Sequence, residues 1–440
     1  MSLNYVRFVA VGLIVAAMTL IPASASSADT LSSISGVGSE PWVLDVTADS
    51  AYVYIGSRDT NEVAVMNASG VPQGLPIVVA DIPCGIALQA DGSHAYVTHS
   101  SLNTVSVIDT VTRVVVSVTV GMEPCAVVAN PDNSEIYVAN RSGNSITVID
   151  TATLATTTFA AGDFAFDLAI SPDGGLLYLA NRGDNTVSVV STSSRSTLST
   201  FAAGNNACAI VASPDGAHVY LGSFSDDTVR SFSTTSFALE ATYTVPLGPC
   251  ALAVNPEGNR VYGAGISGTT VSVIDTVAQA VVQVIAVGDS PQAIALLPNG
   301  SRAYVAVTGD DIVAILAVEM APRLTAATLP EVIPASAYSF ALPFTAQPTP
   351  TFAVTGGALP PGLTLNAATG VISGVPSSTS PNGFTVTASN GFGSDVRAYA
   401  FDVAALPAAG TDLPGPLAVA AGLLFGGLIL SRRRIMRVVG

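Results

Sequence analysis

The stretch GMEPCAVVANPDNSEIYVANRSGNSITVID, residues 121–150, contains the pattern that decides the fold. Residues 125–129 alternate as a strand, and the turn at 130–133 follows, because Pro presets one turn angle while Asp and Asn tolerate the others. Residues 136–138 are β-branched or aromatic and predict a second strand. Residues 145–150 and 156–160 predict a third and a fourth strand. The stretch therefore predicts a small antiparallel sheet of four strands.

The same pattern occurs seven times, at intervals of 41 or 42 residues. Its most regular member is a tyrosine, found at Tyr54, Tyr96, Tyr137, Tyr178, Tyr220, Tyr262 and Tyr304. A turn residue precedes each tyrosine by five positions: Asp49, Asp91, Asp132, Asp173, Asp215, Glu257 and Asn299. A polar residue follows each by seven: Asn61, Asn103, Asn144, Asn185, Asp227, Thr269 and Asp311. A period near 40 built from short strands is typical of a propeller, in which each unit is one blade. The sequence thus predicts an all-β protein with a seven-bladed β-propeller over residues 30–320.

The two ends of this repeat array predict how the ring closes. The last copy, residues 291–318, has three strands and no fourth. Residues 30–38, before the first copy, read like the fourth strand found at residues 281–288 of the preceding copy. We therefore expect this N-terminal strand to complete blade seven and remove the open edge of the sheet.

The amino-acid sequence of the repeats resembles that of the YVTN-type β-propeller family, through Tyr137-Val138-Ala139-Asn140 and residues 103–109, NTVSVID. The resemblance implies a seven-bladed propeller that is exported or exposed on the cell surface. It implies no single activity, since related propellers include binding proteins, lactonases and lyases.

A second domain is expected over residues 321–404, where the 42-residue period stops and proline becomes more frequent. Residues 359–365 followed by 370–376 resemble the Ig/cadherin-like domains of bacterial surface proteins. Residues 384–388 and 399–403 predict closing strands of a small β-sandwich. Some relatives hold calcium at the segment that is here 389–393, but this stretch offers few of the oxygen ligands that Ca²⁺ requires. A plain spacer is favoured, with a calcium site as the alternative.

Both ends of the chain carry transport signals. Residues 1–25 predict a signal peptide, with Arg7, the apolar residues 8–21 and the cleavage site Ala23-Ser24-Ala25. Residues 417–431 predict a transmembrane helix, followed by a basic cytoplasmic tail at 432–440. We therefore expect an exported protein that is held at the cell surface by its C-terminus.

The linker at residues 405–416 carries a motif that bears on the mode of anchoring. Leu406-Pro407-Ala408-Ala409-Gly410 resembles a sortase signal of the Leu-Pro-x-Thr-Gly type, with Ala409 where threonine is cleaved. Retention in the membrane and transfer to cell-wall peptidoglycan both remain open.

The charge balance excludes one class of partner. The chain has 31 acidic residues against 15 basic ones, all arginine, and a net charge of −16. Such a surface repels phosphate backbones, so we expect no nucleic-acid binding.

All four cysteines occupy one place in the repeat, at the start of the innermost strand. The seven residues at this place should ring one mouth of the central channel: Trp42, Cys84, Cys125, Phe166, Cys208, Cys250 and Gln292. Cysteines of exported proteins usually oxidise, and equivalent positions of adjacent blades lie within disulfide reach. The expected bridges are Cys84–Cys125 and Cys208–Cys250; buried free thiols and a metal ring are the alternatives.

No catalytic set is visible in the sequence. His94, His99 and His218 are expected to be solvated loop residues, and none has a carboxylate and a nucleophile beside it in the pattern. We assign no catalytic residue, metal ligand or cofactor. The leading hypothesis is a surface binding or adhesion protein for an unknown extracellular protein or glycan. The alternative is a propeller enzyme of lactonase or lyase type at the channel mouth, for which inner-face loops offer Asp45, Asp163, Asp167 and Asp289.

Overall fold

A computed structural model describes residues 32–318, 320–347, 349–380, 383–390 and 393–401. The expected signal peptide (1–25), sorting motif (406–410), transmembrane helix (417–431) and basic tail (432–440) lie outside the described residues. Within the described ranges, no helix has the length and apolar character needed to cross a membrane.

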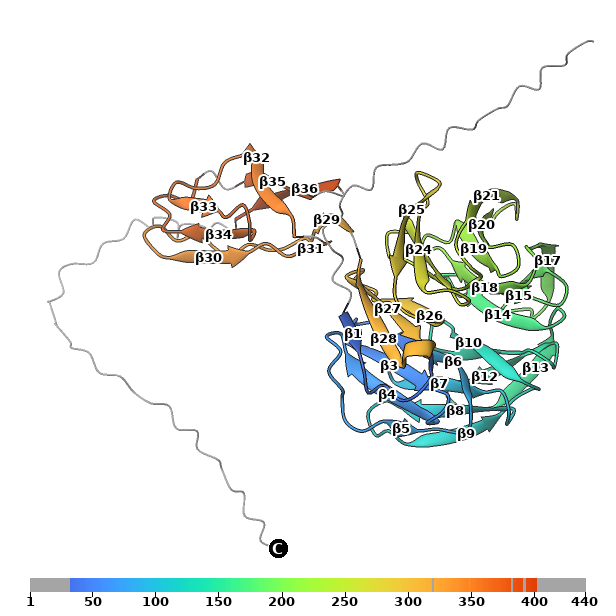
Figure 1. Ribbon diagram of the computed structural model, residues 1–440. Coiled ribbons are helices and arrows are strands. Elements are labelled where there is room, and N and C mark those ends of the chain that lie inside the picture. The colour runs from blue at the N-terminus through green and yellow to red at the C-terminus, as the bar shows by residue number, and fades with distance from the viewer. Residues whose placement is uncertain (1–31, 319, 348, 381–382, 391–392, 402–440) are drawn as a thin grey trace, which may run out of the picture.

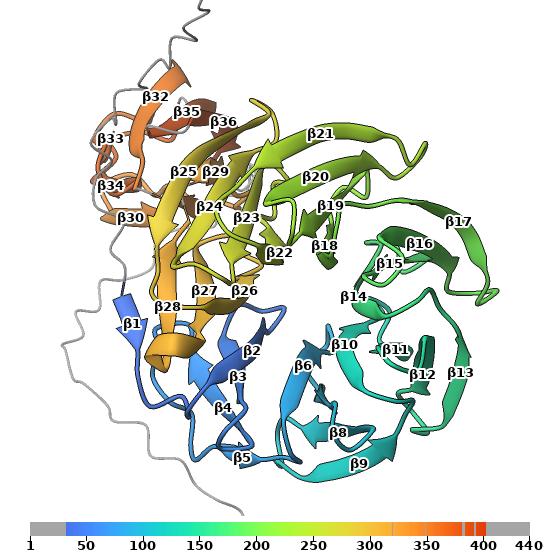
Figure 2. The same cartoon turned by 45° about the vertical axis from the view of Figure 1, so that its right-hand side comes forward.

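Seven four-stranded antiparallel sheets form the propeller, and Figure 2 shows them following one another around a circle in chain order. The innermost strands are β2 (Pro41–Val46), β6 (Pro83–Leu88), β10 (Pro124–Ala129), β14 (Ala165–Ile170), β18 (Ala207–Ala212), β22 (Pro249–Val254) and β26 (Pro291–Leu296). The second strands, which carry the repeating tyrosines, are β3 (Tyr52–Ser57), β7 (His94–His99), β11 (Glu135–Asn140), β15 (Leu176–Asn181), β19 (His218–Ser223), β23 (Arg260–Gly265) and β27 (Arg302–Val307).

The outer half of each blade consists of a well-buried third strand and a largely exposed fourth strand. The third strands are β4 (Glu62–Asn67), β8 (Thr104–Asp109), β12 (Ser145–Asp150), β16 (Thr186–Ser191), β20 (Thr228–Ser233), β24 (Thr270–Asp275) and β28 (Ile312–Ala317), with the short 3-10 turn η1 (Thr308–Asp310) before β28. The fourth strands are β5 (Ile77–Val78), β9 (Val115–Thr119), β13 (Thr156–Ala160), β17 (Thr197–Ala202), β21 (Leu239–Thr244), β25 (Ala280–Ala286) and β1 (Ser32–Ile34).

The strand β1 closes the ring. It pairs antiparallel with β28, so the seventh sheet has the order β1-β28-β27-β26. Ile34 stands opposite Val313 and is buried in a cluster that also contains residues of blade one. The predicted closure by an N-terminal strand is therefore present, and the first and last blades lie side by side (Figures 1 and 2).

In six of the seven blades, the polar residue seven positions after the tyrosine links one blade to the next. Asn144 adopts a positive φ of 46°, a conformation that Asn tolerates better than most residues, and its Oδ1 accepts a hydrogen bond from the Phe164 N–H at 2.9 Å. The same bond is made by Asn61, Asn103, Asn185, Asp227 and Asp311 to the connection that precedes the neighbouring inner strand. The repeat is thus conserved within the chain at the positions that fasten adjacent blades.

The tyrosines pack between blades and supply much of the core. Tyr137 is fully buried and contacts a cluster that includes Leu168 and Leu177 of the next blade. Four of the seven tyrosines are among the largest side chains with under 2% exposure. Because each blade buries its apolar faces against its neighbours, the ring is stabilised as a whole and not blade by blade.

Blade one departs from the pattern in its outer half. Its fourth strand has only two residues, whereas the others outside blade seven have at least five. The chain between β4 and β5 makes an excursion that touches β4 through an isolated bridge between Met66 and Pro72. This excursion shapes a groove between blades one and two.

The C-terminal domain is a β-sandwich-like unit around one apolar core. Its strands are β29 (Met320–Leu324), β30 (Tyr338–Ala341), β31 (Phe344–Gln347), β32 (Thr351–Gly357), β33 (Leu363–Leu365), β34 (Val371–Gly374), β35 (Gly383–Asn390) and β36 (Gly393–Ala400). The sheets β30-β34-β33 and β32-β35-β36 enclose aromatic residues such as Phe352, Phe384 and Tyr399. The last strand starts at Gly393, six residues before the position expected from the sequence, because β35 and β36 form a tight hairpin in which Asn390 pairs with Gly393. Ser389 and Asn390 therefore belong to β35, and Gly393 begins β36.

Candidate functional site at the channel mouth

One cavity at the end of the central channel gathers all seven ring residues. Its volume is about 280 Å³, and its lining includes Trp42, Phe166, Gln292 and the four cysteines. They meet there because each begins, or lies next to the start of, an inner strand, and all seven inner strands start on the same face. The seven residues hold equivalent positions in the seven repeats, and this equivalence alone brings them together in space.

The cysteines form two disulfide bonds between neighbouring blades. Cys84 is joined to Cys125, with their Cα atoms 4.9 Å apart, and Cys208 to Cys250, with 5.0 Å between the Cα atoms. No cysteine in the described ranges is free. These are the pairings expected from the register, and they tie blade two to blade three and blade five to blade six.

Three arginines lie over aromatic rings at this mouth. The Arg58 Cζ atom is 3.9 Å from the centroid of the Trp42 ring. The Arg182 Cζ atom is 4.8 Å from the Phe166 centroid, and Arg141 lies 5.2 Å from Phe164 and 5.9 Å from Phe166. A guanidinium over an aromatic face is attracted by the electrons of the ring, so these stacks hold the arginines in place. We call Arg58, Arg141 and Arg182 the mouth arginines.

The charges of the mouth arginines are only partly neutralised. Arg141 forms an ion pair with Glu123 at 3.2 Å. No carboxylate lies within ion-pair distance of Arg58 or Arg182 among the described residues, and the Arg182 Nε donates to the Asn206 side chain instead. Burial lowers the pKa of Arg58, and the nearby Arg141 charge lowers it further, although Glu40 acts in the opposite direction. In a protein of net charge −16, this mouth is a local concentration of positive charge.

Sequence reasoning missed the mouth arginines, although a signal was present. Each follows its blade's tyrosine by four positions, directly after the second strand: Tyr54 and Arg58, Tyr137 and Arg141, Tyr178 and Arg182. The equivalent residues of the other blades carry no charge: Ser100, Phe224, Ile266 and Thr308. An alignment of the seven copies on this position would have placed three cations on one side of one face.

The four expected inner-face aspartates fall into two kinds. The sequence-based expectation that Asp45 and Asp167 lie on loops is wrong, because both lie on inner strands, β2 and β14. Asp163 and Asp289 lie on connections before inner strands and are exposed. The four residues therefore do not form one cluster.

Asp45 and Asp167 bridge neighbouring blades. The Asp45 carboxylate accepts from the Leu88 N–H at 2.8 Å, and Asp167 accepts from the Ile210 N–H at 2.9 Å. Burial raises the pKa of both carboxyls to about 6, against the opposing effect of these backbone hydrogen bonds. Both keep partial exposure, and Asp167 lines the mouth cavity.

The expectation that all three histidines are solvated loop residues is wrong for His99. His99 is the last residue of β7 and is fully buried. Its Nε2 lies 2.8 Å from the Ser106 hydroxyl and its Nδ1 lies 3.1 Å from the Asp81 carbonyl oxygen, and burial lowers its pKa. His94 and His218 each begin a strand and are partly exposed, with His218 3.0 Å from Glu240.

Metal-ligating groups do not assemble in the part of the chain that the structure describes. No group of three or more His, Cys, Asp or Glu side chains is close enough to hold an ion there. In the sandwich, the Asp395 carboxylate accepts hydrogen bonds from the Leu324 and Val396 N–H groups.

Comparison with known proteins agrees with the two-part architecture. Residues 85–198 match the family model described as "Lactonase, 7-bladed beta-propeller", and residues 321–404 match the one described as "Putative Ig domain". No curated protein sequence matches the chain. Among solved structures, Kuenenia stuttgartiensis hydrazine synthase is similar at 20% identity and a TM-score of 0.59, over 63% of this chain and 96% of that chain. At this identity the likeness shows the fold alone.

The class of protein follows from the sheets and these matches. The chain is a propeller protein whose four-stranded blades are followed by an Ig-like domain. More specifically, its blades two to four resemble the seven-bladed lactonase propellers, while the mouth carries its own set of arginines, aromatic rings and disulfides.

Proposed function

We propose that this protein is an exported binding protein of the cell surface, which recognises an extracellular protein or glycan at the channel mouth. The Ig-like domain serves as a spacer between the propeller and a C-terminal anchor in the membrane or the cell wall. The single observation that carries the proposal is the stacking of the mouth arginines on Trp42, Phe164 and Phe166. Aromatic and arginine side chains on a rigid frame are the residues that most often dominate binding energy at interfaces.

The chemistry of the mouth favours a partner that carries negative charge. Arg58 and Arg182 hold their charges beside Arg141 without carboxylate partners among the described residues, so an anionic group would relieve their repulsion. The disulfides hold the rim in one conformation, which reduces the ordering cost of binding.

The test is binding of the purified protein to arrays of cell-wall glycans and extracellular proteins, followed by variants of the mouth. Arg58→Gln and Arg182→Gln should each weaken capture of an anionic partner and reduce its salt dependence. Arg397→Gln, on β36 of the sandwich, removes the same charge away from the mouth and serves as the matched control. Equal loss in all three variants would contradict a binding site at the mouth. Protease treatment of intact cells tests the proposed surface location.

A lactonase-type activity is the second candidate, favoured by the family match over residues 85–198 and by Asp167 at the mouth. A carboxyl with a pKa of about 6 can act as a general base near neutral pH. The substitution Asp167→Asn should then abolish hydrolysis of a sugar lactone, which is measured through the release of protons. If the parent protein does not hydrolyse the lactone, this candidate is excluded.

A further inference from the structure

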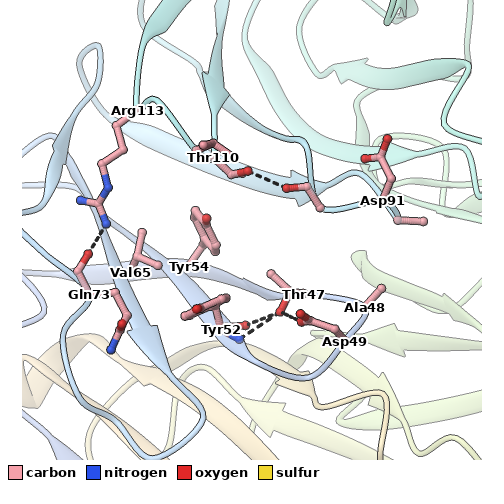
Figure 3. Close-up of a pocket in the computed structure, with 13 residues that line it drawn as sticks. Thr47, Ala48, Asp49, Tyr52, Tyr54, Val65, Gln73, Asp91, Thr110 and Arg113 are labelled. Atoms are coloured by element: carbon pink, nitrogen blue, oxygen red, sulfur yellow. Dashed lines mark hydrogen bonds between the residues drawn. The ribbon is translucent and has the colours of Figure 1, made fainter. Parts of the chain in front are cut away.

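A second and larger cavity lies between blades one and two, at the opposite end of the inner strands from the mouth. Its volume is about 430 Å³, within the range of roughly 300–1,000 Å³ typical of small-molecule sites. Figure 3 shows its polar lining, which includes Thr47, Asp49, Tyr52, Tyr54, Gln73, Asp91 and Arg113. We call it the blade one–two groove.

At the corresponding position between blades three and four lies a carboxylate of the protein itself, that of Glu135. Glu135 stands two positions before Tyr137, and it accepts hydrogen bonds from the Tyr137 hydroxyl at 2.5 Å and from Arg195 at 2.7 Å. Arg195 stands 17 positions after Tyr178, on the neighbouring blade. A carboxylate held by one tyrosine and one arginine therefore fills this position of the repeat.

The blade one–two groove repeats the arginine and the tyrosine but not the carboxylate. Tyr54 corresponds to Tyr137, and Arg113, 17 positions after Tyr96, corresponds to Arg195. The glutamate position is taken by Tyr52, which is 39% exposed. The repeat thus provides an internal comparison in which one groove has its anion and the other lacks it.

Arg113 and Tyr54 lie at the edge of the groove, where Arg113 has carbonyl partners in place of a carboxylate. The Arg113 guanidinium donates to the carbonyl oxygens of Gln73 and Leu75, which belong to the excursion of blade one, and Figure 3 shows it aimed at Gln73. No carboxylate lies within ion-pair distance of Arg113, and the Tyr54 hydroxyl has no hydrogen-bond partner, among the described residues. The carbonyls fix the arginine in position without neutralising its charge.

The rest of the groove is suited to hydroxyl groups. Asp49 uses its Oδ1 for the Thr47 hydroxyl at 2.6 Å and the Ala51 N–H at 2.9 Å, and Asp91 uses its Oδ1 for the Ser93 N–H. The second oxygen of each carboxylate can accept from a ligand. Hydrogen bonds within the turns lower the pKa of both carboxyls, so they are ionised at neutral pH. Two fixed negative charges beside a single arginine disfavour a phosphate dianion and permit a single carboxylate with neutral hydroxyls.

We propose that the blade one–two groove binds an acidic saccharide, with the sugar carboxylate in the place that Glu135 occupies between blades three and four. Arg113 and Tyr54 hold the carboxylate, Asp49 and Asp91 accept from sugar hydroxyls, and the exposed ring of Tyr52 packs against the apolar face of the sugar. The site is separate from the mouth and does not depend on the function proposed for it.

Calorimetric titration of the full-length protein in detergent with D-glucuronate, D-glucose and acetate tests the site. D-glucuronate supplies both the carboxylate and the hydroxyls, and each of the other probes supplies one. We expect saturable binding of D-glucuronate and at least tenfold weaker binding of D-glucose and of acetate. Equal binding of D-glucose, or no saturation by D-glucuronate, would overturn the proposal.

Two variants separate loss of the site from loss of the fold. Arg113→Gln removes the charge and should weaken D-glucuronate binding about tenfold or more. Tyr52→Glu restores the residue type found at Glu135, so it should fill the site and abolish binding while the melting temperature stays at or above that of the parent. Arg195→Gln, in the filled groove, is the matched control and should leave binding unchanged. Unchanged binding in Arg113→Gln and Tyr52→Glu would contradict the assignment, and unchanged binding in Arg58→Gln is expected because the mouth is a different site.

Discussion

At the scale of single residues, the repeat is best understood as a set of hydrogen-bonding positions. The residue seven places after each tyrosine must both adopt a left-handed backbone conformation and present an acceptor to the neighbouring connection, as Asn144 does for Phe164. Asn and Asp meet both requirements, which explains why they occupy six of the seven copies. Thr269, in blade six, is the exception.

Substitutions of Asn144 can separate the two requirements. Asn144→Gly keeps the backbone conformation and loses the side-chain hydrogen bonds to Phe164 and to the exposed Asp163, so we expect a cost of about 1 kcal/mol. Asn144→Ala loses both and should cost about 1 kcal/mol more. Urea denaturation measures the two differences. Thr269→Ala, at the exposed exception, should stay within about 0.5 kcal/mol of the parent, and a larger loss there would contradict the proposed role of the position.

His99 shows a buried position that can be filled in more than one way. It occupies the place of Asn140 in blade three and Asn181 in blade four, which bond to Thr147 and Ser188 as His99 bonds to Ser106. His99→Asn should therefore be tolerated better than His99→Leu, which leaves the buried Ser106 hydroxyl unsatisfied at a cost of about 1–3 kcal/mol.

The same histidine predicts a dependence of stability on pH. Burial lowers the pKa of His99 in the folded protein, so the unfolded chain binds a proton more readily as pH falls below the ordinary value of 6.5. Its contribution to stability is present above pH 6.5 and is lost on acidification. Free energies of unfolding at pH 7 and pH 5 should therefore differ less in His99→Asn than in the parent. An equal difference in both proteins would show that His99 does not titrate in this way.

At the scale of elements, a short strand pairing closes the ring. The strand β1 contributes three residue pairs to β28, and Ile34 is its buried member. Ile34→Ala should cost about 2–4 kcal/mol, since it leaves a cavity between the first and last blades. Ser33→Ala, on the exposed side of the same strand, should be nearly neutral. Thermal unfolding of the two variants compares them, and similar melting temperatures would contradict a structural role for β1.

The disulfides join neighbouring inner strands and should stabilise the propeller by restricting the unfolded chain. Each closes a segment of about 41 or 42 residues, for which loop-closure entropy gives roughly 4 kcal/mol as an upper guide. Replacing Cys84 and Cys125 by Ala, or Cys208 and Cys250 by Ala, should lower the unfolding free energy by similar amounts. Non-reducing peptide mapping checks the pairing, and a Cys125–Cys208 link would contradict it.

At the scale of the whole molecule, the buried carboxylates of the channel add a second pH effect of opposite sign. Burial raises the pKa of Asp45 and of Asp167 to about 6 in the folded protein, above the ordinary value of 3.8. The folded protein therefore binds protons between about pH 4 and 6 that the unfolded chain does not, and these groups favour folding more as pH falls through that window. The double variant Asp45→Asn/Asp167→Asn should lose this gain. The difference in unfolding free energy between variant and parent, measured at pH 7 and pH 4, isolates the effect from other titrating groups.

The architecture of the propeller could be predicted from the sequence because a period of 41 or 42 residues constrains every blade at once. The tyrosines, turn residues and cysteines recur in register, so the strands, the closure by β1 and the two disulfides followed from counting. The mouth arginines and the blade one–two groove did not, because they arise from departures of single blades from the repeat. Tyr52 and Arg113 are ordinary residues in the sequence, and only their meeting across two blades gives them a role.

The closure of the ring also determines how the protein would respond to mechanical tension. The chain leaves the propeller from Ala317, at the end of β28, and this strand is held between β27 and the short β1. A pull applied from the C-terminal side therefore enters the molecule at the blade that closes the ring, where β1 contributes three residue pairs. The two disulfides join blades two and three and blades five and six, so neither of them reinforces the seam between β1 and β28.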